Sequence, residues 1–146
     1  MSSYPNMEIE SLPTLTARVL IVDDHVDSLI YAKYASEACG YHVTIRECGN
    51  RLVETALTCK PDIILLDLCL NDTTGYEVFR QLKSCRQTQN IPVVAVTAMV
   101  TEDVRAQCVE TGFTYFLAKP FTVEELDAAI RCYKKITVDT SGMKAA

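Results

Sequence analysis

The stretch Pro61–Asp67, Pro-Asp-Ile-Ile-Leu-Leu-Asp, decides the fold of this chain. Four consecutive large aliphatic residues stand between two carboxylates, and a short apolar run bounded in this way is typical of a strand buried on both faces. Such a strand belongs in the middle of a parallel sheet, where ligands bind outside the carboxyl ends of the strands. Asp67 lies at that end. We therefore expect the rest of the chain to build a pocket around this carboxylate.

Length and composition indicate one soluble globular domain. The chain has 146 residues, of which 49% are hydrophobic and 23% charged, and its net charge is -5. Lysine and arginine form no run, which argues against nucleic-acid binding. No segment approaches the roughly 18 apolar residues of a membrane span, and residues 1–17 lack the basic and apolar parts of a signal peptide. We expect a cytoplasmic protein that binds neither nucleic acid nor membrane.

The cysteines are numerous but form no recognisable framework. There are seven, an odd number, with no Cys-x-x-Cys pair and no histidine at ligand spacing. Most stand in apolar segments, where cysteine behaves as a small hydrophobic residue. The sequence therefore predicts reduced thiols rather than a zinc site or a set of disulfides.

Strand and helix patterns alternate along the chain. Strands are expected at 18–24, 41–46, 61–67, 92–97 and 113–118, and helices at 26–38, 51–58, after Thr74, at 101–111 and after Thr122. Parallel strands joined through helices need right-handed crossovers, so the helices cover both faces of the sheet. We divide the chain into a flexible extension (1–16), one α/β domain (17–136) and a flexible tail (137–146).

Several helix boundaries can be read from local signals. Asn50 is the expected N-cap of the helix at 51–58, and Thr-x-x-Glu spacings at 74–77 and 122–125 predict capping boxes. Glycine ends the helices at 26–38 and 101–111. The residues expected on apolar helix faces are Val26, Leu29, Ile30, Ala32, Tyr34 and Ala38, then Val78, Phe79 and Leu82, and finally Val123, Leu126, Ala129, Ile130 and Tyr133.

Polar residues end four of the strands: Asp23 and Asp24, Asp67, Thr97 and Lys119. In a parallel sheet these ends meet at one edge. Two carboxylates about 4 Å apart repel by roughly 4 kcal/mol at an effective dielectric constant of 20, so three together need a cation or a shared proton. An all-oxygen site of this kind suits Mg²⁺. With the lysine and the hydroxyl it predicts a phosphoryl site, with Asp67 as the nucleophile that forms an acyl phosphate.

These motifs and their order resemble the receiver domains of two-component response regulators, in particular single-domain, chemotaxis-type receivers. The resemblance covers about residues 17–136. It rests on Asp23-Asp24, Leu65-Leu66-Asp67, Gly75 eight residues further on, Val96-Thr97-Ala98 and Lys119-Pro120-Phe121. Thr97 follows Asp67 by 30 residues, and Lys119 follows Thr97 by 22. The resemblance implies a doubly wound five-stranded parallel sheet of flavodoxin-like order 2-1-3-4-5.

The resemblance also implies the role of each site residue. Asp67 accepts a phosphoryl group from a histidine kinase or a histidine phosphotransfer protein. Mg²⁺ is bound by Asp24 and Asp67, by Asp23 commonly through water, and by the backbone carbonyl of Cys69. Thr97 and Lys119 bind the phosphoryl oxygens, and Lys119-Pro120 is expected to be a cis peptide.

The implied output is a conformational switch. Thr97 and Phe116 transmit phosphorylation to a downstream target through the face formed by the helix 101–111, the strand 113–118 and the helix after Thr122. The implied protein is a stand-alone response regulator, a monomer or weak homodimer. It is not an enzyme on external substrates, but takes part in its own phosphotransfer and slow dephosphorylation.

Two departures from the family pattern bear on phosphoryl lifetime. Asn71 stands where many receivers have proline, which predicts a more mobile loop, and position 69 is cysteine, of which only the carbonyl is needed. His25 and Asp72 border the site, and we interpret both as solvated loop residues.

Other functions stay open at this point. A magnesium-dependent phosphohydrolase would use Asp67 on an external substrate, but no insertion is long enough for the cap that such enzymes usually need. A pseudo-receiver would bind partners without phosphorylation. The chain could also be a receiver fragment of a hybrid histidine kinase.

Overall fold

The computed structural model describes residues 16–113 and 115–132. Residues 1–15 of the expected extension, the expected tail and Tyr133 therefore lie outside the described part. The strands are β1 (Arg18–Val22), β2 (His42–Arg46), β3 (Ile63–Asp67), β4 (Val93–Thr97) and β5 (Tyr115–Ala118). The helices are α2 (Val26–Ala38), α3 (Leu52–Cys59), α4 (Gly75–Ser84), α5 (Glu102–Thr111) and a helix of residues 123–132. The alternation expected from sequence is confirmed.

The five strands form one parallel sheet in the order β2-β1-β3-β4-β5, as predicted. β3 lies in the middle, between β1 and β4, and all five of its residues are buried. The aliphatic run at 63–66 therefore forms the central strand because both of its faces are covered. Its carboxyl end carries Asp67.

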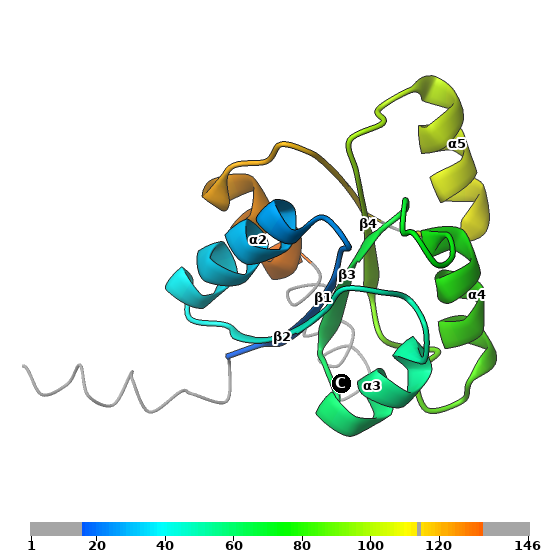
Figure 1. The fold of residues 1–146 in the computed structure, drawn as a ribbon, viewed down its shortest axis with the longest axis horizontal. Coiled ribbons are helices and arrows are strands. Elements are labelled where there is room, and N and C mark those ends of the chain that lie inside the picture. Colours follow the sequence, from blue (N-terminus) through cyan, green and yellow to red (C-terminus); the bar gives the residue numbers. More distant parts are fainter. Residues whose placement is uncertain (1–15, 114, 133–146) are drawn as a thin grey trace, which may run out of the picture.

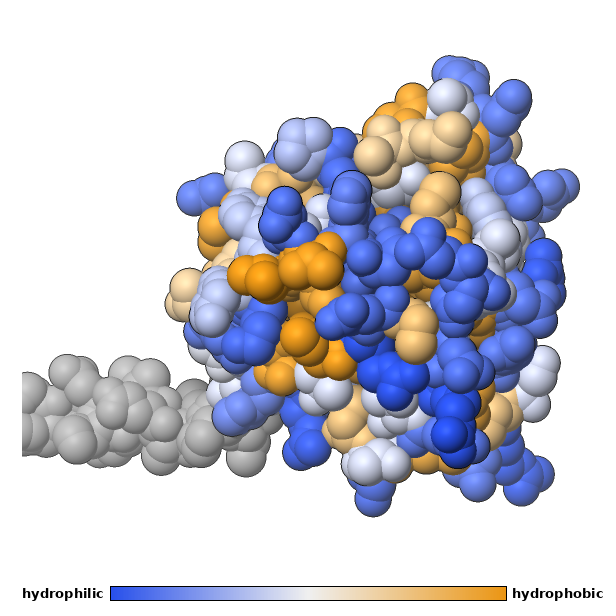
Figure 2. Space-filling model, viewed as in Figure 1, coloured by the Kyte–Doolittle hydropathy of each residue, from blue (hydrophilic) through white to orange (hydrophobic). Residues whose placement is uncertain are grey.

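Helices cover both faces of the sheet (Figure 1). α2 and the helix 123–132 lie on one face, where Leu29, Leu126 and Ile130 pack against β1, β3 and β4. α3, α4 and α5 lie on the other face, where Leu52, Val78 and Leu82 pack against the alternate side chains of the same strands. The surface in Figure 2 is largely hydrophilic, with hydrophobic residues in small groups. Within the described residues, no helix is long and apolar enough to cross a membrane.

The apolar face predicted for α2 is partly wrong. Val26, Ile30 and Tyr34 are 52%, 44% and 62% exposed. Leu29 and Ala32 are buried as predicted, and the other buried positions are Ala35 and Ser36. Apolar residues stand on several sides of this helix, so periodicity alone does not predict which side is buried. The side that packs closely against the sheet is the one with small residues. An apolar side of α2 is thus left exposed.

The predicted start of α3 is also wrong. Its N-cap is Arg51, in a left-handed conformation with φ 59°, and no side chain caps the helix. Asn50 instead donates its N–H to Asp72 and accepts a hydrogen bond from Arg46 through its carbonyl oxygen. These are bonds of the Asn50 backbone, which is held by Arg46 and by the distant Asp72, while the Asn50 side chain does not cap α3.

The other predicted boundaries agree with the structure. Thr74 and Thr101 cap α4 and α5 through their side chains, and Gly112, with φ 118°, ends α5. At 122–125 the capping box is complete, because Thr122 and Glu125 exchange backbone-to-side-chain hydrogen bonds. At 74–77 only half forms, since the Glu77 carboxylate pairs with Arg80 instead.

Candidate functional site

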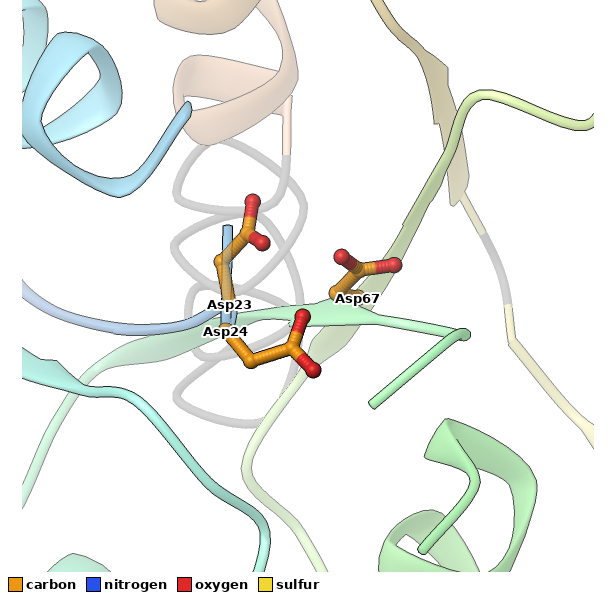
Figure 3. Close-up of side chains that lie close together, drawn as sticks. All are labelled: Asp23, Asp24 and Asp67. Atoms are coloured by element: carbon orange, nitrogen blue, oxygen red, sulfur yellow. The ribbon is translucent and has the colours of Figure 1, made fainter. Parts of the chain in front are cut away.

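Three carboxylates meet at the carboxyl ends of β1 and β3. Asp23 and Asp24 directly follow β1, and Asp67 is the last residue of β3. One oxygen from each lies within 4.8 Å of the others. Figure 3 shows the three side chains gathered across the two strand ends. Asp23 and Asp67 are each only 5% exposed, whereas Asp24 is intermediate, so two negative charges are held almost out of water.

The ammonium group of Lys119 joins the two buried carboxylates. Its Nζ lies 2.7 Å from Asp23 Oδ2 and 3.1 Å from Asp67 Oδ2. The lysine follows β5, and its backbone N–H donates to the carbonyl of Thr97 at 2.8 Å. The Lys119-Pro120 peptide is cis, as predicted. One positive charge therefore offsets part of the repulsion between two negative charges.

Burial and neighbouring charges shift the pKa values of Asp67 and Lys119. Burial, together with the neighbouring Asp23, raises the pKa of Asp67 to about 6, although Cys69 N–H and Lys119 act in the opposite direction. Burial alone would lower the pKa of Lys119, but its two carboxylate partners outweigh this and raise it. Lys119 is therefore a permanent cation at neutral pH, and Asp67 is mostly ionised.

A cavity of about 420 Å³ opens over these groups. Its lining residues are Asp24, His25, Asp67, Cys69, Leu70, Asn71, Thr97, Ala98, Met99 and Lys119. Thr97, 2% exposed, ends β4 and accepts a hydrogen bond from Met99 N–H through Oγ1 at 3.0 Å. Its own hydroxyl proton remains available to donate into the cavity.

The loop after β3, residues 68–74 (the β3–α4 loop), wraps closely around Asp67. Cys69 N–H donates to Asp67 Oδ1 at 3.0 Å, and Cys69 and Thr74 form an antiparallel bridge. A Cβ at Gly75 would lie 2.6 Å from the carbonyl oxygen of Asp67. Position 75 therefore requires glycine because the helix start lies against the end of the strand.

Phe116 lies apart from this cavity. It stands on β5, half-buried against the cluster beneath α3–α5, and the guanidinium carbon of Arg105 lies 4.9 Å from the centre of its ring. The structure thus brings together Asp23, Asp24, Asp67, Thr97 and Lys119, and places the predicted switch aromatic beside α5.

Sequence reasoning undervalued three residues near the site. His25 and Met99 both line the cavity, and Met99 is 57% exposed. Asp72 is exposed but not simply solvated, because its two carboxylate oxygens accept the N–H groups of Gly49 and Asn50. A carboxylate in a loop of this kind carries no local signal for partners more than twenty residues away.

The donor set fits a hard divalent cation. All candidate ligands are oxygens, which Mg²⁺ prefers over sulfur or nitrogen. Asp24 makes no hydrogen bond or ion pair with any residue in the described part of the chain, whereas Asp23 and Asp67 already accept bonds from protein groups. Asp24 therefore has the most accessible oxygens of the three.

Comparison with known proteins gives one consistent result. The family model of the response regulator receiver domain matches residues 19–131. The phosphate regulon transcriptional regulatory protein PhoB of Pseudomonas aeruginosa is 34% identical over 119 residues, which cover 82% of this chain and 52% of PhoB. The chain thus spans about half the length of that relative.

A further relative and one solved receiver domain are each matched along nearly their whole length. The polar-differentiation response regulator DivK of Brucella ovis is 29% identical over 119 residues, covering 82% of this chain and 97% of DivK. The receiver domain of the sensor histidine kinase PA1611 from Pseudomonas aeruginosa PAO1 is similar with a TM-score of 0.76 at 27% identity, covering 82% of this chain and 98% of that domain. That structure holds a magnesium ion in its active-site cleft.

Proposed function

Because this chain belongs to the family of response regulator receiver domains, we propose that Asp67 accepts a phosphoryl group from a phosphohistidine of a partner protein. The modification switches the affinity of this chain for a downstream protein. A histidine kinase or a histidine phosphotransfer protein is the donor.

One observation carries this proposal: Lys119 Nζ lies 3.1 Å from Asp67 Oδ2 while the same ammonium contacts Asp23. An ammonium held beside the buried Asp67 carboxylate is placed to neutralise the oxygens of a group that becomes attached there. Such a group would also meet the Thr97 hydroxyl, which lines the same cavity.

The transfer follows from these groups. An ionised Asp67 oxygen attacks the phosphorus atom, the new P–O bond forms, and the P–N bond to the donor imidazole breaks. The electron pair of that bond stays on the imidazole nitrogen, which takes up a proton. Lys119 and Thr97 bind the equatorial oxygens throughout, so the chain contributes mainly positioning and charge.

In this proposal the cluster of Asp23, Asp24 and Asp67 is the Mg²⁺ site. Asp24 and Asp67 would bind Mg²⁺ directly, with the Cys69 carbonyl, and Asp23 through water. Asp24 supports this assignment best, because its side chain has no hydrogen-bond or ion-pair partner among the described residues, whereas Asp23 and Asp67 each accept a backbone N–H and contact Lys119. Bound there, Mg²⁺ supplies further neutralisation of the phosphoryl oxygens.

The output in this proposal runs through Thr97 and Phe116 to the face of α5, β5 and the helix 123–132. α5 is suited to move because Cys108 is its one buried residue within the described chain. In this proposal the phosphoryl donor binds this chain beside Asp67. Helix α2 exposes Val26 and Ile30 there. A cavity of about 620 Å³ near the start of α2 is lined in part by Tyr31, Lys119 and Phe121.

Intact mass spectrometry tests the proposal. Wild-type protein and Asp67→Asn are incubated with acetyl phosphate and Mg²⁺. We expect one phosphoryl group on the wild type and none on the variant. No adduct on the wild type would overturn the proposal. Repeated turnover of free phosphomonoesters would favour the phosphohydrolase instead.

A further inference from the structure

Asp72 joins two loops that lie far apart in the sequence. Its Oδ1 accepts the N–H of Gly49 at 3.1 Å, and its Oδ2 accepts the N–H of Asn50 at 2.8 Å. These partners belong to residues 47–51, the β2–α3 loop. Among the described residues, these are the hydrogen bonds that tie residues 70–73 of the β3–α4 loop to another segment.

The same two loops are packed against each other. A Cβ at Gly49 would lie 2.7 Å from Thr73 Cγ2 and 3.1 Å from Leu70 Cδ1. Arg46 holds the far side of the β2–α3 loop by donating to the Asn50 carbonyl at 2.7 Å. The carboxylate of Asp72 therefore closes a contact that already excludes any side chain at position 49.

The contact between the two loops restrains the β3–α4 loop near Cys69, which stands three residues before Asp72. The Cys69 N–H donates to Asp67, and its carbonyl is the backbone oxygen proposed as a metal ligand. The position of a metal ligand on a loop depends on how firmly the loop is held. Loss of a group that orients such a ligand typically lowers metal affinity by about 10–100-fold.

We infer that Asp72 is a positioning residue for the metal site: by tying the β3–α4 loop to the β2–α3 loop, it fixes the Cys69 carbonyl for Mg²⁺. The inference rests on the proposed function. The loop that Asn71 was expected to loosen is thus held by its neighbour.

Calorimetric titration with Mg²⁺ tests this inference on three variants. Asp72→Asn leaves one carbonyl oxygen to accept from two N–H groups, those of Gly49 and Asn50. Asp72→Glu keeps the negative charge, but its longer side chain places the carboxylate away from these two N–H groups. We expect each to weaken Mg²⁺ binding about tenfold. Asp62→Asn is the matched control, because Asp62 also accepts a backbone N–H, that of Arg18 at 2.8 Å, at the opposite end of β3. Its Mg²⁺ affinity should equal that of the wild type.

A second readout separates positioning from stability and from charge. Amide exchange measured by NMR should slow at Gly49 and Asn50 when Mg²⁺ binds the wild type, but not in Asp72→Asn. Unchanged Mg²⁺ affinity in Asp72→Asn would overturn the inference. Wild-type Mg²⁺ affinity in Asp72→Glu would also overturn it, because the negative charge alone would then account for the effect of Asp72. A wild type that binds no Mg²⁺ would overturn the proposed function as well, so the two failures are distinguishable.

Discussion

Lys119 and Asp67 stand 52 residues apart in the chain, yet Nζ of the lysine lies 3.1 Å from Oδ2 of the aspartate. Asp67 ends β3 and Lys119 directly follows β5, and the two strands are separated in the sheet by β4. The lysine therefore reaches across the end of β4, where Thr97 lies, to meet the carboxylates. The proposed phosphoryl site depends on this contact, because the lysine brings a cation beside the Thr97 hydroxyl and the Asp67 carboxylate around one cavity.

Replacing the cation should destabilise the fold. Lys119→Met leaves Asp23 and Asp67 buried without their shared partner, and breaking a buried ion pair from one side costs about 3–5 kcal/mol of unfolding free energy. Urea denaturation at pH 7.5 without divalent ions measures this. Lys33→Met is the control, since the Lys33–Glu37 pair is exposed and should contribute less than about 1 kcal/mol. Equal losses in both variants would contradict a special role for the buried lysine.

Removing the nucleophile should have the opposite effect. The pKa of Asp67 in the folded protein, about 6, is raised above its ordinary value of 3.8, so ionising this carboxyl disfavours the folded state. That cost is absent below about pH 4 and fully present above about pH 6. In metal-free buffer at pH 7.5, Asp67→Asn should therefore be more stable by about 1–3 kcal/mol. The gain should shrink as the pH falls to 4, and a gain independent of pH would show that ionisation of Asp67 is not its cause.

The hydroxyl of Thr97 should be needed for transfer. Thr97→Val keeps the shape but donates no hydrogen bond to the phosphoryl oxygens, and loss of one such donor costs about a hundredfold in rate. Thr97→Ser should stay near the wild-type rate. Acyl phosphate formation from acetyl phosphate, followed by mass spectrometry, compares the three proteins. A Thr97→Val variant as fast as Thr97→Ser would exclude this role.

Much of the fold could be predicted because its signals are local. The aliphatic run before Asp67 predicts a central strand, and Gly112 predicts the end of α5. The site residues could be predicted as a group because each stands at a strand end, and parallel strands bring those ends to one edge.

The remaining features depend on contacts between distant segments. Arg51 adopts a left-handed conformation at the start of α3, and the neighbouring Asn50 is held by Asp72 from another loop. On α2, both the buried and the exposed sides carry apolar residues, so only the packed sheet reveals that Tyr34 is outside and Ser36 inside. No local pattern contains this information.

Ser36 offers a test of packing that leaves the site untouched. Its hydroxyl is fully buried, and Oγ has no hydrogen-bond partner among the described residues. Ser36→Ala removes the unsatisfied group, so thermal or urea unfolding should show a gain of about 1 kcal/mol or more. Ser84→Ala, which removes a hydroxyl bonded to the Arg80 carbonyl on α4, should gain little. A loss of stability in Ser36→Ala would show that its hydroxyl has a partner.

Reductive trapping of the acyl phosphate tests the role of Asp67 as phosphoryl acceptor. Wild-type protein is treated with acetyl phosphate and Mg²⁺, reduced with borohydride, digested and sequenced by mass spectrometry, with Asp67→Asn treated in parallel. An acyl phosphate at Asp67 is reduced to homoserine, so we expect homoserine at position 67 of the wild type and at no carboxylate of the variant. Homoserine at Asp23 or Asp24 instead, or an unmodified wild-type chain, would contradict this role.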